Sequence, residues 1–326
     1  MTSLAHGDRV PVRFGTYTTA DATRLRSGRW DPVGMQVRGS VVLLGGRKEF
    51  LEKYAETAAD LVRRGFRVFG FDWRGQGLSG RRLPERLKGY VRDYGHYVQD
   101  LAEFFQNCVQ PEAARPVFIL AHSMGAHVAL RFLHRHPQAV DKAVLVSPML
   151  DIDTKPFPRW VVAGLARLGL LIGAEEALVP GSGGRTNVDR PFEGNTLTAD
   201  PRRFAVEKNA VALNPDLALG GVTFAWLSAT LASIAHIRRT GYLERIHTPV
   251  LMVAAAADRV VSVAAQRRAC RLLPDCRLVV IPGARHEILM ETDAIQSQFW
   301  RAFDEFIVHP LRELRTGGDS FSPRGR

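Results

Sequence analysis

The chain has 326 residues, of which 46% are hydrophobic and 24% are charged. This composition is typical of a globular protein with a sizeable core, and the length fits one large α/β domain carrying an insertion. The net charge of +11 makes nucleic acid or an anionic membrane surface conceivable as a partner. The basic residues are dispersed and form no stripe interleaved with aromatic residues, so we expect a solvated basic surface and no nucleic-acid partner.

The cysteine pattern and the apolar segments indicate a soluble, cytoplasmic protein. Cys108, Cys270 and Cys276 are odd in number and lack metal-ligand spacing, so we expect three reduced thiols, with neither a disulfide framework nor a zinc site. The first residues contain no basic segment followed by an apolar one, which argues against secretion. The longest apolar stretch, residues 160–173, is interrupted by Arg167 and is too short to cross a bilayer.

The first half of the chain predicts a sheet. Residues 12–26 have a short extended pattern around Asp21, which indicates a hairpin at the edge of that sheet. After it, buried-strand patterns alternate with amphipathic helix patterns. Strands are predicted at residues 41–44, 67–71, 118–121 and 143–146, with helices over 51–62, around 97–105 and over 124–135. Each crossover between parallel strands needs a helix, so the alternation predicts a mostly parallel sheet flanked by helices.

The alternation stops between residues 148 and 244. This segment holds two apolar helical patterns, residues 160–172 and 224–237, separated by the Gly/Pro-rich residues 180–195. We expect residues 148–244 to form a helical lid inserted over the active site. The alternative is a helical subdomain that packs on the core without acting as a lid.

The strand and helix patterns resume after the insertion. Strands are predicted at residues 250–254 and 278–281, and helices at 264–273 and 295–308. The core domain is therefore expected to comprise residues 1–147 and 245–310. Residues 311–326 are expected to form a disordered basic tail.

The central motif is the segment of residues 118–127, an apolar strand pattern that ends at Ser123 and continues as a helix. In a nucleophile elbow, Gly-x-Ser-x-Gly, small residues on either side of the serine let the strand and the helix approach closely. Here Ala121 occupies the first small position and Gly125 the second. Ser123 is therefore the predicted nucleophile, and the alternative is an ordinary helix N-cap serine.

A serine hydroxyl needs a general base, and the base needs an acid that orients it. Asp258 follows the predicted strand at 250–254, and His286 follows the one at 278–281. Ligands bind at the carboxyl ends of parallel strands, so we expect Ser123, Asp258 and His286 to meet there as a catalytic triad in the order typical of α/β-hydrolases. The alternatives are a helix N-cap for Asp258 and a surface loop position for His286.

Acyl transfer also needs hydrogen-bond donors for the developing oxyanion. The backbone N–H groups of Met124 and of Arg47, in the loop after the strand at 41–44, are the predicted donors. Gly45 and Gly46 allow the tight backbone path that such a loop requires, and the alternative is an ordinary turn.

Together these segments resemble the monoacylglycerol lipase and lysophospholipase group of the α/β-hydrolases, sometimes named after serine aminopeptidases, over nearly the whole chain. The matching segments are Lys53-Tyr54-Ala55, Phe71-Asp72-Trp73-Arg74-Gly75-Gln76-Gly77-Leu78-Ser79-Gly80, His122-Ser123-Met124-Gly125, Val146-Ser147-Pro148, Asp258-Arg259 and Gly283-Ala284-Arg285-His286-Glu287. The resemblance implies a helical cap, the triad named above and hydrolysis of a single-chain lipid ester without a cofactor. Ala121 and Gly45 depart from the family pattern, which usually has glycine and histidine there.

We therefore predict a serine carboxylic ester hydrolase that cleaves a lysophospholipid or a monoacylglycerol through an acyl-enzyme. No cofactor and no metal are expected, and the net charge allows weak contact with an anionic membrane surface. Apolar residues of the insertion, each of which could equally be subdomain core, are expected to line an acyl pocket: Trp160, Leu165, Leu168, Phe224, Trp226 and Leu227.

Two other functions stay open at this point. The same triad cleaves amides, so an aminopeptidase-type peptidase or amidase is possible. An acidic cluster in the insertion would favour it, and the adjacent pair there is Glu175 and Glu176. A non-catalytic binding module on the hydrolase fold is the second alternative, because fold does not imply function.

Overall fold

The structure is a computed structural model that describes residues 10–154, 156–183, 186–189 and 191–308. An eight-stranded sheet forms its centre, in the order β1-β2-β4-β3-β5-β6-β7-β8. The strands are β1 (Val12–Thr18), β2 (Arg24–Trp30), β3 (Gly39–Leu44), β4 (Phe66–Phe71), β5 (Val117–His122), β6 (Lys142–Val146), β7 (Val250–Ala255) and β8 (Cys276–Ile281). The pairs from β4 to β8 are all parallel, which confirms the mostly parallel sheet predicted from the alternation.

The predicted edge hairpin is confirmed. β1 and β2 pair antiparallel, with Val12 opposite Trp30 and Thr18 opposite Arg24, and β1 is the edge strand. β2 continues beyond the predicted end at residue 26 as far as Trp30, whose side chain is buried.

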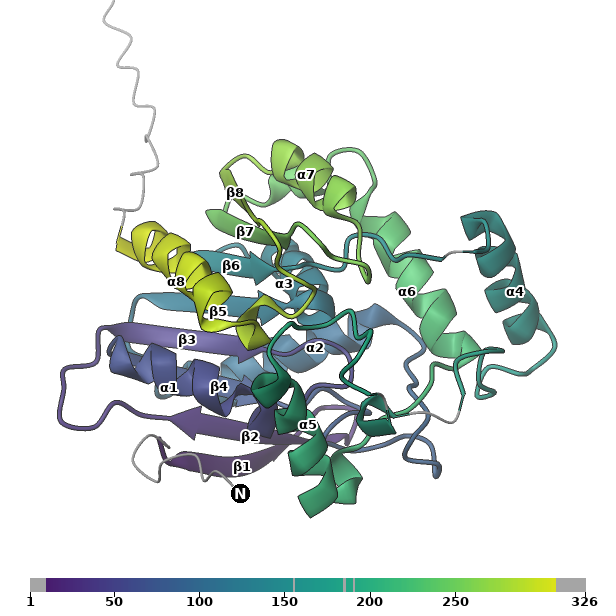
Figure 1. Cartoon of the computed structure of the whole chain (residues 1–326), viewed down its shortest axis with the longest axis horizontal. Helices are drawn as coiled ribbons and strands as arrows, with labels where there is room; N and C mark the ends of the chain where they lie inside the picture. The colour runs from purple at the N-terminus through teal and green to yellow at the C-terminus, as the bar shows by residue number, and fades with distance from the viewer. Residues whose placement is uncertain (1–9, 155, 184–185, 190, 309–326) are drawn as a thin grey trace, which may run out of the picture.

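Helices cover both faces of the sheet (Figure 1). They are α1 (Ala55–Arg63), preceded by the short 3-10 helix η1 (Leu51–Tyr54), α2 (Tyr94–Phe104), α3 (Ser123–Arg135), α7 (Val263–Leu272) and α8 (Asp293–Val308). One apolar layer packs α1 and α8 against the sheet, and a second layer packs α2, α3 and α7 against the opposite face. Burial of these apolar side chains stabilises the fold and leaves the loops at the strand ends to carry the site.

The described residues of the insertion at 148–244 form three α-helices, α4 (Arg159–Leu171), α5 (Pro201–Leu213) and α6 (Phe224–Ile237), and the short 3-10 helices η3 (Asn187–Asp189) and η4 (Pro215–Leu217). The predicted helix at 224–237 has the bounds of α6, and the one at 160–172 is offset by one residue from α4. α4 is the outermost helix, and α6 lies between it and the core (Figure 1).

Helix α5 was not predicted from the sequence, because two of its three buried residues are charged. Arg203 and Glu207 occupy its buried face together with Val211, so the apolar stripe that marks most helices is missing. The start of the helix does carry a signal, since the Asp200 side chain accepts hydrogen bonds from the N–H groups of Arg202 and Arg203.

Small residues form the buried face of α4. Ala166 and Gly169 are buried, and a Cβ atom at Gly169 would lie 2.4 Å from the ring of Phe224 on α6. The large side chains of α4 therefore stand on its other sides.

Among the described residues, every helix is too short or too polar to span a bilayer.

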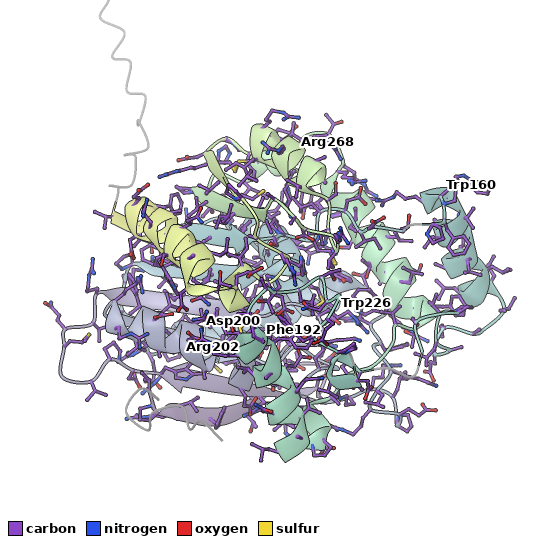
Figure 2. The ribbon with its side chains drawn as sticks, in the orientation of Figure 1. Trp160, Phe192, Asp200, Arg202, Trp226 and Arg268 are labelled. Carbon is purple, nitrogen blue, oxygen red and sulfur yellow. A yellow bond between two sulfur atoms is a disulfide. The ribbon has the colours of Figure 1, made fainter. Side chains whose placement is uncertain are left out.

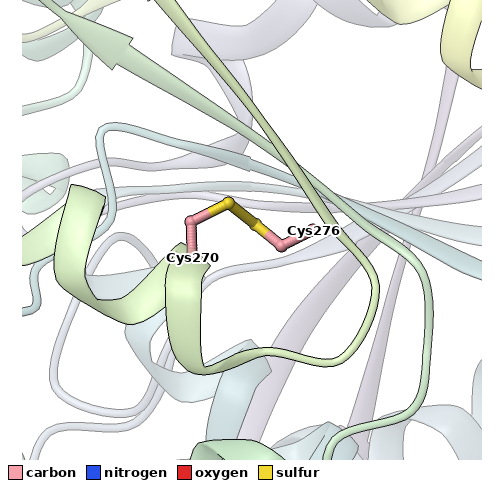
Figure 3. Close-up of a disulfide and its surroundings, with 2 residues drawn as sticks. All are labelled: Cys270 and Cys276. Atoms are coloured by element: carbon pink, nitrogen blue, oxygen red, sulfur yellow. A yellow bond between two sulfur atoms is a disulfide. The ribbon is translucent and has the colours of Figure 1, made fainter.

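The expectation of three reduced thiols is wrong. Cys270 and Cys276 form a disulfide, with their Cα atoms 5.4 Å apart (Figure 3). The chain reverses between the end of α7 and the start of β8, so the last helical turn lies against the first residue of the strand. The prediction failed because an odd number of cysteines does not exclude a disulfide between two of them. Cys108 is the free thiol. The predicted tail at residues 311–326 lies outside the described residues.

Candidate active site

The elbow motif forms a sharp turn between strand and helix. β5 ends at His122 and α3 begins at Ser123, whose backbone φ of +50° lies in the left-handed region. Such strain at a non-glycine residue is typical of a nucleophile elbow. A Cβ atom at Gly125 would lie 2.4 Å from the carbonyl oxygen of Gly45, so this position needs glycine. Ala121, which departs from the family pattern, is fully buried within β5.

The structure brings Ser123, Asp258 and His286 together. Nε2 of His286 lies 3.0 Å from Oγ of Ser123, and its Nδ1 lies 2.8 Å from Oδ2 of Asp258. The other oxygen of Asp258 accepts hydrogen bonds from the N–H groups of Val260 and Val261 at 2.8 and 3.0 Å. A serine, a base and an oriented acid are thus in hydrogen-bond reach of one another, as acyl transfer requires.

Asp258 is held in its ionised form. Burial by itself would raise the pKa of this carboxyl group, but the hydrogen bond and charge of His286 and the two backbone N–H groups bring the pKa below its ordinary value. A carboxylate at this position can stabilise the imidazolium that forms when His286 takes a proton.

The loop after β3 reaches the nucleophile. A Cβ atom at Gly46 would lie 3.1 Å from Cβ of Ser123, so Gly46 permits the close approach. The N–H of Gly46 donates to the Glu49 carboxylate, and the next amide along the chain is that of Arg47. Met124 lies in the first turn of α3, where N–H groups have no acceptor within the helix. Both predicted oxyanion donors therefore belong to segments that flank Ser123.

The side chain of Arg47 is directed toward the insertion. Its Nη2 donates to the carbonyl oxygen of Gly220 at 2.7 Å, and its guanidinium carbon lies 5.0 Å from the ring centre of Trp226. This cation–π contact ties the loop after β3 to helix α6.

The Gly-rich segment at residues 72–80 supports the same loop. Nε1 of Trp73 donates to the carbonyl oxygen of Gly45 at 2.8 Å, and Oε1 of Gln76 accepts from the N–H of Lys48 at 2.6 Å. These contacts give the segment a structural role in shaping the candidate oxyanion loop.

The residues expected to line an acyl pocket separate into two groups. Phe224, Trp226 and Leu227 of α6 are buried, whereas Trp160, Leu165 and Leu168 of α4 are 76, 39 and 53% exposed. Figure 2 shows Trp160 at the outer edge of the molecule and Trp226 toward its centre. The structure therefore does not bring the six side chains together, because α4 packs on α6 through its small residues.

Sequence reasoning missed a charged cluster beside the triad. Glu49 and Lys53 are buried next to His122, and Lys53 also contacts Glu207 and Glu287. The signal available in the sequence was the spacing of Glu49 and Lys53, two opposite charges four positions apart next to the apolar positions of the predicted helix at 51–62. A cavity of about 310 Å³ adjoins the cluster, lined in part by Lys53, Glu207 and Glu287. In the part of the chain that the structure describes, no group of three or more His, Cys, Asp or Glu side chains could hold a metal ion.

Comparisons with a family model and with known proteins point to the same family. A family model described as serine aminopeptidase, S33 matches residues 35–293. Lysophospholipase L2 of Escherichia coli K12 is 34% identical, over 92% of this chain and 84% of that protein. Human monoglyceride lipase is 22% identical, over 93% of this chain and 92% of that protein.

Solved structures give the same fold. A soluble variant of monoglyceride lipase from Saccharomyces cerevisiae, solved with a substrate analog, aligns with a TM-score of 0.72 at 19% identity and covers 91% of this chain and 96% of that one. A thermostable carboxyl esterase from Bacillus coagulans aligns with a TM-score of 0.69 at 17% identity, covering 91 and 97%. The chain therefore has the α/β-hydrolase fold, belongs to the serine aminopeptidase S33 family in the group of lysophospholipases and monoacylglycerol lipases, and is a serine hydrolase.

Proposed function

We propose that the chain hydrolyses a carboxylic ester of a single-chain lipid, a lysophospholipid or a monoacylglycerol, through an acyl-enzyme on Ser123. The observation that carries the proposal is the pair of contacts made by His286, at 3.0 Å to Ser123 and 2.8 Å to Asp258. This geometry supports catalytic roles for Ser123, Asp258 and His286.

The reaction proceeds in two halves. Nε2 of His286 takes the proton from Ser123 as Oγ attacks the ester carbonyl, and the backbone N–H groups of Met124 and Arg47 stabilise the oxyanion. His286 then gives the proton to the leaving alcohol, which departs and leaves the acyl group on Ser123. A water molecule, deprotonated by His286, attacks the acyl-enzyme and releases the fatty acid, and the proton returns to Ser123. Asp258 stabilises the imidazolium in both halves.

The lipid substrate is supported by the relatives. The Escherichia coli relative is named a lysophospholipase, and more distant relatives are named monoglyceride lipases. A lid formed by residues 148–244 fits such a substrate, because α6 carries the buried apolar residues Phe224, Trp226 and Leu227 next to the loop that holds Arg47.

The outer face of α4 is the proposed contact with an anionic membrane surface. Trp160, Leu168 and Leu171 share one side of this helix and are 76, 53 and 76% exposed. Arg159–Leu171 contains two arginines and no acidic residue, and the whole chain has a net charge of +11. A helix with exposed Trp and Leu side chains and without acidic residues suits the interface of an anionic bilayer, which would supply the substrate. The expected cytoplasmic and membrane-peripheral location remains a prediction.

The peptidase alternative has less support. Recognition of a free substrate amine by the adjacent pair needs two available carboxylates, and of the two the Glu175 carboxylate is paired with Arg92 whereas Glu176 is exposed.

A substrate panel tests the proposal. Hydrolysis rates would be compared for p-nitrophenyl acetate, octanoate and palmitate, for lysophosphatidylglycerol and monooleoylglycerol, and for aminoacyl p-nitroanilides. We expect octanoate and palmitate to be preferred to acetate, turnover of at least one of the two natural lipids, and no turnover of the anilides. A preference for acetate or for anilides would contradict the lipid ester assignment.

A further inference from the structure

Five ionisable side chains meet behind the nucleophile elbow. Glu49 and Lys53 come from the segment after β3, His122 ends β5, Glu287 follows His286, and Glu207 comes from α5 of the insertion. None is more than 8% exposed. The proposed reaction assigns no role to any of them.

The Glu49 carboxylate is saturated with hydrogen-bond donors. It accepts from the N–H of Gly46, the hydroxyl of Tyr54, Nδ1 of His122 at 3.1 Å and Nζ of Lys53 at 3.1 Å. A carboxylate has about four lone-pair sites, so this one has no capacity left. Burial by itself would raise the pKa of Glu49, but Lys53 and His122 hold it well below its ordinary value.

His122 is held between two acceptors. Its Nδ1 faces the Glu49 carboxylate, and its Nε2 lies 3.2 Å from the backbone carbonyl oxygen of His286. Neither acceptor carries a hydrogen, so both contacts are hydrogen bonds only when both ring nitrogens carry a proton. In its doubly protonated form, His122 joins Glu49 to the backbone of His286.

Lys53 makes a second connection to the same loop. Its Nζ lies 2.7 Å from Oε1 of Glu287, the residue after His286, and 3.1 Å from Oε1 of Glu49. It also lies 3.4 Å from Oε2 of Glu207, which links the cluster to the insertion. Glu49 thus reaches the His286 loop through His122 and through Lys53.

We propose that Glu49 is a positioning residue for the acyl transfer proposed above, on which this inference rests. Its carboxylate holds the Gly46 amide, which sets the path of the loop that presents the Arg47 amide to the oxyanion. Through His122 and Lys53 it also fixes the loop that carries His286. Glu49 therefore keeps two groups from separate strands, the oxyanion donor and the general base, in register with Ser123.

The composition of the cluster favours this role over a purely stabilising one. Desolvating several charges is costly, and replacing a buried ion pair with apolar residues is often neutral or stabilising. Misplacement of a catalytic group by about 1 Å can lower a rate about 10²-fold. A charged cluster that bonds two catalytic loops is explained by alignment more readily than by stability.

The substitution Glu49→Gln tests the inference, because an amide has the same size but cannot accept from all four donors. On p-nitrophenyl butyrate, we expect kcat to fall about 10²-fold with KM within about twofold of wild type. The rate of phosphonylation of Ser123 by a fluorophosphonate should fall by a similar factor. Glu103→Gln is the matched control: Glu103 is a buried carboxylate on α2 that accepts a hydrogen bond from the N–H of Ala20 at the edge hairpin, and its loss should lower Tm without lowering kcat.

Substitutions of Lys53 provide an independent test if the Glu49→Gln variant does not fold. Lys53→Met should lower kcat with little change in KM, and Lys53→Arg should restore most of it. Nitrogen-15 NMR of labelled histidine should show both ring nitrogens of His122 protonated at pH 8 in the wild type. A folded Glu49→Gln or Lys53→Met enzyme with kcat within about threefold of wild type would overturn the inference, as would an equal loss of kcat in Glu103→Gln.

Ser123→Ala separates this inference from the proposed function. If Ser123→Ala keeps esterase activity, the acyl-enzyme mechanism fails, and the positioning role fails with it. If Ser123→Ala is inactive while Glu49→Gln is fully active, only the positioning role fails.

Discussion

Nε2 of His286 lies 3.0 Å from Oγ of Ser123, although 163 positions separate the two residues in the sequence. The contact exists because β5 and β8 run in the same direction in one sheet, so the residues that follow them emerge at the same edge. The parallel topology therefore brings His286 close to Ser123 although the two residues are far apart in the sequence. The same argument applies to Asp258 after β7.

Replacing Asp258 with asparagine should remove most of the activity. An asparagine cannot stabilise the imidazolium of His286 and favours the wrong tautomer, so we expect kcat to fall about 10⁴-fold with little change in KM. Steady-state kinetics on p-nitrophenyl butyrate measure this. A loss of less than tenfold would show that Asp258 does not orient His286.

The stabilising contribution of Asp258 should depend on pH. Its folded-state pKa lies below the ordinary value of 3.8, so its contribution is present above that value and is lost as the pH falls through the folded-state pKa. The Tm difference between wild type and Asp258→Asn should therefore shrink as the pH falls below about 4. A difference that grew with acidification would contradict the direction of this pKa shift.

Binding to anionic vesicles should depend on the outer face of α4. Leu171→Ser removes an exposed apolar side chain, which should weaken binding to phosphatidylglycerol vesicles about tenfold, as co-sedimentation can measure. Leu213→Ser is the matched control, because Leu213 ends α5 and is 89% exposed, compared with 76% for Leu171. Equal binding by the two variants would argue against α4, and loss of binding with a change in oligomeric state would indicate a contact between copies of the chain.

Thiol titration should find one free cysteine. Unfolded, unreduced protein should react with one equivalent of a thiol reagent through Cys108, and reduced protein with three, because Cys270 and Cys276 are bonded. Burial raises the pKa of the Cys108 thiol to about 11, so its alkylation in the folded protein at pH 8 should be slow. Three reactive thiols without reduction would contradict the disulfide.

The sequence predicts those parts of the structure that local pattern encodes. Residues 224–237 are apolar on nearly every side and flanked by clear limits, so α6 is predicted to the residue. The proposed catalytic residues Ser123, Asp258 and His286 each follow a predicted strand, and parallel topology alone brings them together. Periodicity cannot tell which side of an apolar helix is buried, and on α4 the small residues Ala166 and Gly169 face inward.

Other features depend on tertiary contacts that no local pattern records. Arg203 and Glu207 are buried on α5, so the pattern of that helix resembles a polar segment. The central position of Glu49 is evident only from its hydrogen bonds with Gly46, His122 and Lys53 in the folded chain. The disulfide depends on the turn between α7 and β8, which sets the distance between Cys270 and Cys276.

The measurement that tests the central assignment most directly is labelling with a fluorophosphonate probe, followed by mass spectrometry of the modified peptide. The assignment predicts one modification, on Ser123, that is absent in Ser123→Ala and much slower in His286→Ala. Folded wild-type protein that does not react, or that is modified at another residue, would contradict a serine hydrolase mechanism centred on Ser123.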